Sequence, residues 1–193
     1  MRFGGVLIYS FIRVTLSCHV CFAVLAMGTR KLPFLSQKNV ILSGTKTTVT
    51  GNQANKLTLT TQVPYLRKDS NTATFSVKFN IKEKKTAIGF SVTQPPIDTY
   101  LIPDHYSERD YISMGGAGFL YPMRTSATRG YKEGDLVTVK LNFSNATISF
   151  FVNGDPVGST PWPSSSSSVM IEEAYPFVSC EGGLLDMDIW SED

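Results

Sequence analysis

GYKEGDLVTVKLNFSNATISFFVNGDPVG, residues 130–158, is the stretch that decides the fold of this chain. Apolar side chains occupy alternate positions in two runs of it: Val137, Val139, Leu141 and Phe143, then Ile148, Phe150 and Val152. Such alternation is typical of strands with one buried face and one wetter face. Residues 143–147 connect the two runs, and Asn153 with Gly154 is a strong turn signal because both tolerate positive φ. The stretch therefore predicts an antiparallel hairpin followed by a tight turn.

Runs rich in Val, Ile, Thr, Phe and Tyr recur through most of the chain, separated by Gly, Pro, Asn and Asp. They predict strands over residues 40–43, 46–50, 56–61, 73–79, 86–92, 111–114, 118–121, 136–143, 147–152, 175–179 and 184–190. No window of a dozen residues shows the 3.6-residue period of a helix. Many short strands with turn signals indicate an all-β antiparallel sandwich or barrel rather than alternating βαβ units.

Composition supports one globular domain and limits its chemistry. The chain has 193 residues, of which 42% are hydrophobic and 18% charged, with a formal net charge of +2. Arg2 and Arg13 are the only charged residues before Met27, so the remainder carries no net charge. A neutral domain argues against a nucleic-acid partner held by the bulk electrostatic field.

Residues 1–26 form an apolar leader with a basic start. Val24 and Ala26 would suit a signal cleavage site, whereas Arg13 interrupts the apolar run. The leader is therefore open to three interpretations: a signal peptide or anchor, another targeting segment, or an extension upstream of a start at Met27. Residues 27–39 are expected to be a linker, and residues 40–193 the β-sandwich domain.

Few residues could carry catalysis or bind a metal. After Met27 the chain has one histidine, His105, and one cysteine, Cys180, which are too few for the usual zinc sites. Asp186 and Asp188 share one strand face and could hold a metal or act as a carboxylate pair, but no third acid stands on that face, so a solvated strand face is the favoured interpretation. We expect no enzyme activity, no cofactor and no metal.

Several motifs together resemble the SPRY domain. They are Tyr131, Gly134, Asp135 and Val137, then Ile148, Ser149, Phe150, Asn153 and Gly154, then Tyr175, Pro176, Phe177 and Val178. Residues 87–90 look like that family's glycine-containing core strand. The strand at 73–79 lacks the Trp and Glu of many members, and no Leu-Asp-Pro motif of a PRY segment is present.

The resemblance implies a bent antiparallel β-sandwich of the concanavalin-like type whose loops capture a protein or peptide. We expect six residues to contact the partner, because Tyr, Trp and Arg dominate binding hot spots. They are Tyr65, Arg67, Tyr100, Tyr106, Arg124 and Trp162.

Two further expectations concern the setting of the domain. The chain is expected to be a monomeric adaptor in the cytoplasm, with membrane contact only if the leader is an uncleaved anchor. A secretory leader would instead favour a lectin-like carbohydrate binder, and would expose the sequons at Asn142 and Asn145 to glycosylation.

Overall fold

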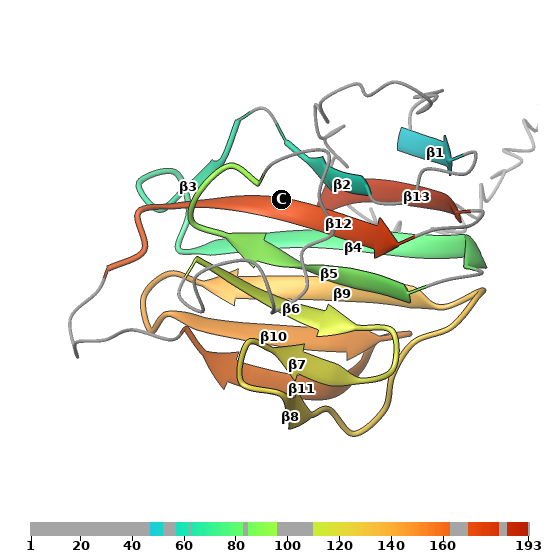
Figure 1. The fold of residues 1–193 in the computed structure, drawn as a ribbon. Coiled ribbons are helices and arrows are strands. Elements are labelled where there is room, and N and C mark those ends of the chain that lie inside the picture. Colours follow the sequence, from blue (N-terminus) through green and yellow to red (C-terminus); the bar gives the residue numbers. More distant parts are fainter. Residues whose placement is uncertain are drawn as a thin grey trace, which may run out of the picture.

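A computed structural model describes residues 47–51, 57–61, 63–82, 85–95, 110–162, 170–181 and 185–192. These residues form two antiparallel sheets packed face to face, with no helix among them (Figure 1). The prediction of an all-β antiparallel sandwich is therefore confirmed. The leader, the linker and the strand expected at 40–43 lie outside the described residues.

The first sheet contains six strands in the spatial order β1–β13–β4–β9–β10–β11. Their bounds are β1 Thr47–Gly51, β13 Leu185–Glu192, β4 Thr72–Lys82, β9 Leu136–Asn142, β10 Thr147–Val152 and β11 Asp155–Pro161. The stretch that opened the sequence analysis supplies the last three of these strands. Its hairpin register pairs Thr147 with Asn142 and Val152 with Val137, as the alternation predicts.

The second sheet contains seven strands, six of them in the order β2–β12–β5–β6–β7–β8, with β3 also paired to β12. Their bounds are β2 Leu57–Thr60, β12 Glu173–Glu181, β5 Lys85–Ser91, β6 Tyr111–Gly115, β7 Phe119–Tyr121, β8 Thr125–Ser126 and β3 Tyr65–Leu66. The strands β3, β8 and β11 were not expected from the sequence. Residues 159–161, which none of the predicted strands includes, belong to β11.

The core lies between the sheets and is built from the alternate apolar positions of both. The first sheet contributes Phe75, Val77, Phe79, Val137, Val139, Leu141, Ile148, Phe150 and Val152, and the second contributes Leu59, Ile88, Phe90, Ile112, Met114 and Val178. Phe75 and Phe90 meet edge to face across the interface, with ring centroids 5.1 Å apart. A separate cluster of Tyr111 and Phe177, with Tyr121 packed against it, contains no residue of the main core.

The strand ends gather at two opposite ends of the sandwich (Figure 1). We call one the loop end; its described residues are 61, 63–71, 92–95, 122–124, 143–146, 162 and 170–172. We call the other the turn end; it contains residues 116–118, 127–135 and 153–154.

Candidate binding site at the loop end

Strand pairing brings segments far apart in the sequence together at the loop end. Leu66 of β3 pairs with Glu173 at the start of β12, and Ser91 at the end of β5 pairs with both Tyr175 and Tyr111. In the other sheet the start of β4 lies beside the end of β9. Tyr65, Arg67, Arg124 and Trp162 all come from segments at this end. Tyr100 and Tyr106 lie outside the described residues.

Tyr65 connects the loop end to the core. Its hydroxyl donates to the Thr74 carbonyl at 3.1 Å, and its ring meets Phe90 edge to face at 6.1 Å. The side chain is half-buried. Tyr65 therefore presents only part of its surface to a partner, and it also fixes β3 against the sandwich.

Arg67 is held beside β12 by two contacts with one residue. Its backbone N–H donates to the Glu172 carbonyl at 2.9 Å, and its Nη1 lies 3.4 Å from Glu172 Oε1. The side chains of Arg67 and Glu172 are 28% and 66% exposed. A partly exposed ion pair of this kind stabilises the fold weakly, so the guanidinium remains available for further hydrogen bonds.

Arg124 and Trp162 differ in exposure. Arg124 is exposed on the turn between β7 and β8, where its φ is 54°. Trp162 is only 5% exposed and packs within the main core, while its backbone N–H donates to the Ala146 carbonyl at 2.7 Å. The Trp162 side chain therefore offers little area to a partner, because the core takes almost all of it.

Three exposed apolar residues at this end were missed by the sequence reasoning. Val63 is 60% exposed, Met170 is 65% exposed and Met123 is 37% exposed. All three stand in loops or turns, where no periodic pattern tells an exposed apolar residue from a buried one. They add hydrophobic area to an end that already has Arg67 and Glu172.

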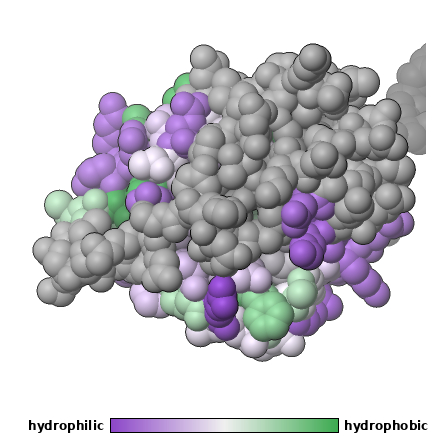
Figure 2. Space-filling view, viewed as in Figure 1, coloured by the Kyte–Doolittle hydropathy of each residue, from purple (hydrophilic) through white to green (hydrophobic). Residues whose placement is uncertain are grey.

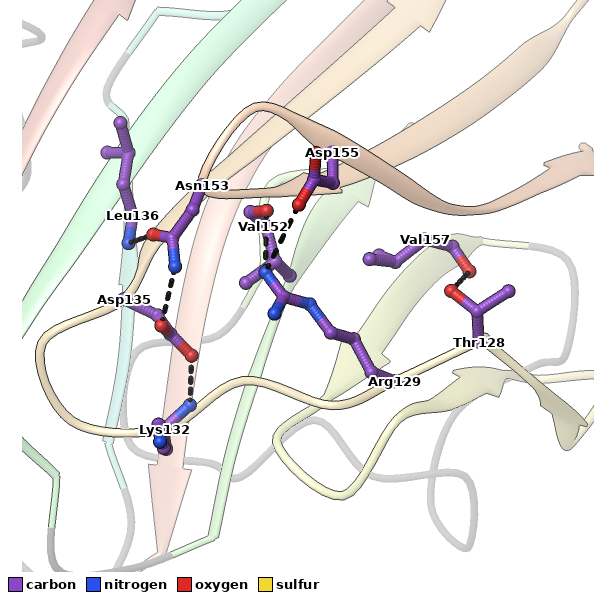
Figure 3. Close-up of polar contacts among 9 residues, drawn as sticks. All are labelled: Thr128, Arg129, Lys132, Asp135, Leu136, Val152, Asn153, Asp155 and Val157. Atoms are coloured by element: carbon purple, nitrogen blue, oxygen red, sulfur yellow. Dashed lines mark hydrogen bonds and ion pairs between the residues drawn. The ribbon is translucent and has the colours of Figure 1, made fainter.

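Two of the motif residues that resemble SPRY domains, Asp135 and Asn153, form a structural network at the turn end (Figure 3). The carboxylate of Asp135 accepts the Lys132 backbone N–H at 2.9 Å and the Asn153 Nδ2 at 2.8 Å. Asn153 Oδ1 accepts the Leu136 N–H at 2.8 Å. These contacts join the start of β9 to the β10–β11 turn, so Asp135 and Asn153 stabilise the fold.

Arg129 extends this network toward the hairpin of β7 and β8. Its Nη2 donates to the Val152 carbonyl at 2.8 Å and lies 4.0 Å from Asp155 Oδ2. The neighbouring Thr128 donates its backbone N–H to the Val157 carbonyl at 2.8 Å. Its side-chain hydroxyl donates to the same oxygen at 3.2 Å, as Figure 3 shows. Residues 128 and 129 are thus fastened to the end of β10 and to the edge strand β11.

The groups considered for catalysis do not gather in the described part of the chain. Cys180 is 7% exposed, and burial raises the pKa of its thiol to about 11. Asp188 is half-buried and accepts from Asn80 Nδ2 at 3.4 Å. His105 and the side chain of Asp186 lie outside the description. Within the described ranges, no three His, Cys, Asp or Glu residues are placed to hold a metal ion, and no helix is suited to cross a membrane.

The architecture and the loop arrangement define a class: the described chain has the fold of SPRY domains, within the wider concanavalin-like group. The SPRY domain of human HERC1 superposes with a TM-score of 0.56 and 18% identity, covering 81% of this chain and 93% of that one. Another human SPRY domain gives 0.50 and 20%, covering 82% and 96%.

A lectin domain shares the fold. The carbohydrate recognition domain of Emp46p gives a TM-score of 0.52 and 11% identity, covering 81% of this chain and 87% of that one. No protein-family model and no curated protein sequence matches this chain. The similarity to these domains therefore lies in the fold. The sequence resemblance to SPRY domains is confined to the motifs named in the sequence analysis.

Proposed function

We propose that this chain is a non-catalytic protein–protein interaction module that captures a peptide or a partner surface at its loop end. The observation that carries the proposal is that Tyr65, Arg67 and Arg124 all lie at one end of the sandwich. Loops supported by such a scaffold are the usual site of binding residues. The SPRY fold is consistent with this use.

Substitution of Arg67 and Tyr106 together tests this proposal. The double variant Arg67→Ala/Tyr106→Ala is expected to fold normally and to lose partner capture from a cell lysate, because both hydrogen-bond donors and an aromatic surface are removed. Lys140→Ala is the control, since Lys140 is exposed on β9 in the first sheet. Undiminished capture by the double variant would remove these residues from the site.

Cellular location needs its own experiment. We propose a cytoplasmic monomer, and N-terminal mapping of the native protein by mass spectrometry tests whether the chain starts at Met27 or carries residues 1–26. Processing after Ala26, with a glycan on Asn142 or Asn145, would instead place the chain in the secretory pathway. Asn142 Oδ1 accepts the Ser144 N–H at 2.9 Å, whereas Asn145 is exposed on the β9–β10 hairpin.

Carbohydrate binding is the second candidate function, favoured by the fold shared with the Emp46p domain. A glycan array separates the two candidates. Specific retention of a glycan that survives the Arg67→Ala/Tyr106→Ala substitution would favour the lectin function over peptide capture.

A further inference from the structure

Lys82, the last residue of β4, places its side chain over the glycine-rich bend between β6 and β7 at the turn end. A Cβ built on Gly116 would lie 2.6 Å from Lys82 Nζ and 2.8 Å from its Cε. The ammonium also lies over the ring of Tyr131, 5.4 Å from the ring centroid. Lys82 therefore reaches from the first sheet to the second, and the missing side chain of Gly116 leaves the room that it occupies.

Two fixed side chains line the same space. Tyr131 is 3% exposed and stacks on Phe79, with ring centroids 4.9 Å apart. Thr86 of β5 is 2% exposed, and its Oγ1 lies 3.3 Å from the Cβ position of Gly116. Within the described ranges this hydroxyl has no hydrogen-bond partner. A buried hydroxyl without a partner and a packed ammonium thus face one space.

The Lys82 side chain is only half-buried, so its amine is not sealed from solvent. Figure 2 shows hydrophilic side chains on the right of the view, where Figure 1 places the turn end. A polar reagent can therefore approach this end of the sandwich.

The ammonium of Lys82 has no carboxylate partner in the part of the chain that the structure describes. The charged residues on the elements around it are Lys85, Arg129, Lys132, Glu133 and Asp135, and none of them forms an ion pair with it. Burial without a counter-ion lowers the pKa of Lys82 below its ordinary value. A larger fraction of this amine is therefore neutral near pH 8, and the neutral amine is the nucleophilic form.

We propose that Lys82 Nζ is a site of acylation by thioesters, selected by the packing of its side chain over Tyr131 and Gly116. The neutral amine attacks the thioester carbonyl carbon, the C–S bond breaks, and the leaving thiolate takes up the proton that the nitrogen loses. The product is an uncharged amide, which can form a hydrogen bond with Thr86 Oγ1. Acylation removes a charge that lies half-buried without a counter-ion, so the fold should tolerate it.

Acetylation of the full chain by acetyl-coenzyme A at pH 8, followed by peptide mass spectrometry, measures the rate at each lysine. Lys82 should react at least about threefold faster than Lys140, which is exposed on β9. Gly116→Ala keeps Lys82 but takes its space, because the new Cβ would meet the flexible end of the lysine side chain. The rate at Lys82 should then fall to within about twofold of the rate at Lys140. Asp155→Asn, at an exposed side chain of the same end, should leave the rate at Lys82 unchanged.

A pH series on the wild-type protein gives a second measurement that needs no variant. The rate at Lys82 should level off at a lower pH than the rate of free Nα-acetyl-lysine, since an amine of lowered pKa is fully neutral sooner. Three results would each overturn the proposal: equal rates at Lys82 and Lys140, an unchanged rate at Lys82 in Gly116→Ala, or a pH profile that matches free Nα-acetyl-lysine. None of them bears on partner capture at the loop end, so the two proposals fail separately.

Discussion

Asn153 and Asp135 join the turn between β10 and β11 to the start of β9, with Asn153 Nδ2 donating to Asp135 Oδ1 at 2.8 Å. Asn153 adopts a φ of 56°, which asparagine tolerates better than most residues. Asp135 is only 8% exposed, so its carboxylate depends on these protein donors for hydrogen bonding. The two residues therefore hold the β10–β11 turn against the start of β9.

Asn153→Asp should destabilise the fold by about 2–3 kcal/mol at pH 7, because it removes a donor and places two carboxylates together. The folded variant then binds a proton more tightly than the unfolded chain, so the loss should shrink as the pH falls toward about 4. Urea unfolding at both pH values measures this. Asp155→Asn, at a side chain that is 79% exposed, is the control, and an equal loss at both pH values would contradict the prediction.

Gly130→Ala should cost about 4 kcal/mol or prevent folding, since its Cβ would strike the Gly116 carbonyl oxygen and lie 2.9 Å from Ala117 C. These atoms belong to the backbone of residues 116–118, so they cannot yield without moving the glycine-rich bend at residues 115–118. Gly154→Ala is the matched comparison. Its φ of 86° strains an alanine by about 1–2 kcal/mol, yet no atom lies within 4 Å of the new Cβ. If Gly130→Ala and Gly154→Ala lowered the thermal unfolding midpoint by the same amount, the close approach of Gly130 to residues 116–118 would be contradicted.

Cys180 should make the fold less stable at alkaline pH. Its thiol pKa rises from 9.0 to about 11 through burial, so the folded state holds the proton longer than the unfolded state. The resulting stability is fully present below pH 9 and is lost as the pH rises toward 11. Unfolding measured from pH 8 to pH 11 should show this slope in the wild type and a reduced slope in Cys180→Ala. Identical slopes would contradict the assignment.

Trp162→Ala should destabilise the fold by about 3–5 kcal/mol, because it opens a large cavity in the core. Met170→Ala, by contrast, should change stability by less than about 0.5 kcal/mol, since Met170 is 65% exposed. Chemical unfolding compares the two. If the Trp162→Ala protein had normal stability but no longer captured a partner, Trp162 would belong to the binding surface instead of the core.

Local pattern was enough to predict most strands and the hairpin of residues 136–152. Residues 147–152 were predicted exactly, because alternation of Ile148, Phe150 and Val152 is a local property. β11 was missed because it contains Pro156 and Pro161, and proline is tolerated only where a strand edge needs no N–H donor. The two-residue strands β3 and β8 were missed because only their partner strands define them.

The sequence predicted which residue types stand in the candidate site, but it did not predict which of them are exposed. The sequence indicated Arg67 and Trp162 by the same argument, yet Arg67 is partly exposed beside Glu172 and Trp162 is buried. Nothing local distinguishes them, since burial depends on what packs against a loop. The exposed Phe119 shows a related case. It stands next to Leu120 in the strand predicted at 118–121, and two consecutive apolar residues do not reveal which one faces solvent.

The sequence by itself determined that this chain is all-β, a sandwich or a barrel, with tight turns at fixed places, because strand alternation and turn propensity act over a few residues. Only the tertiary structure decided which loops share an end, that Asp135 and Asn153 serve the fold, and that Phe119 and Met123 face outward. Those outcomes depend on strand order and on packing between residues many positions apart, which no local pattern encodes.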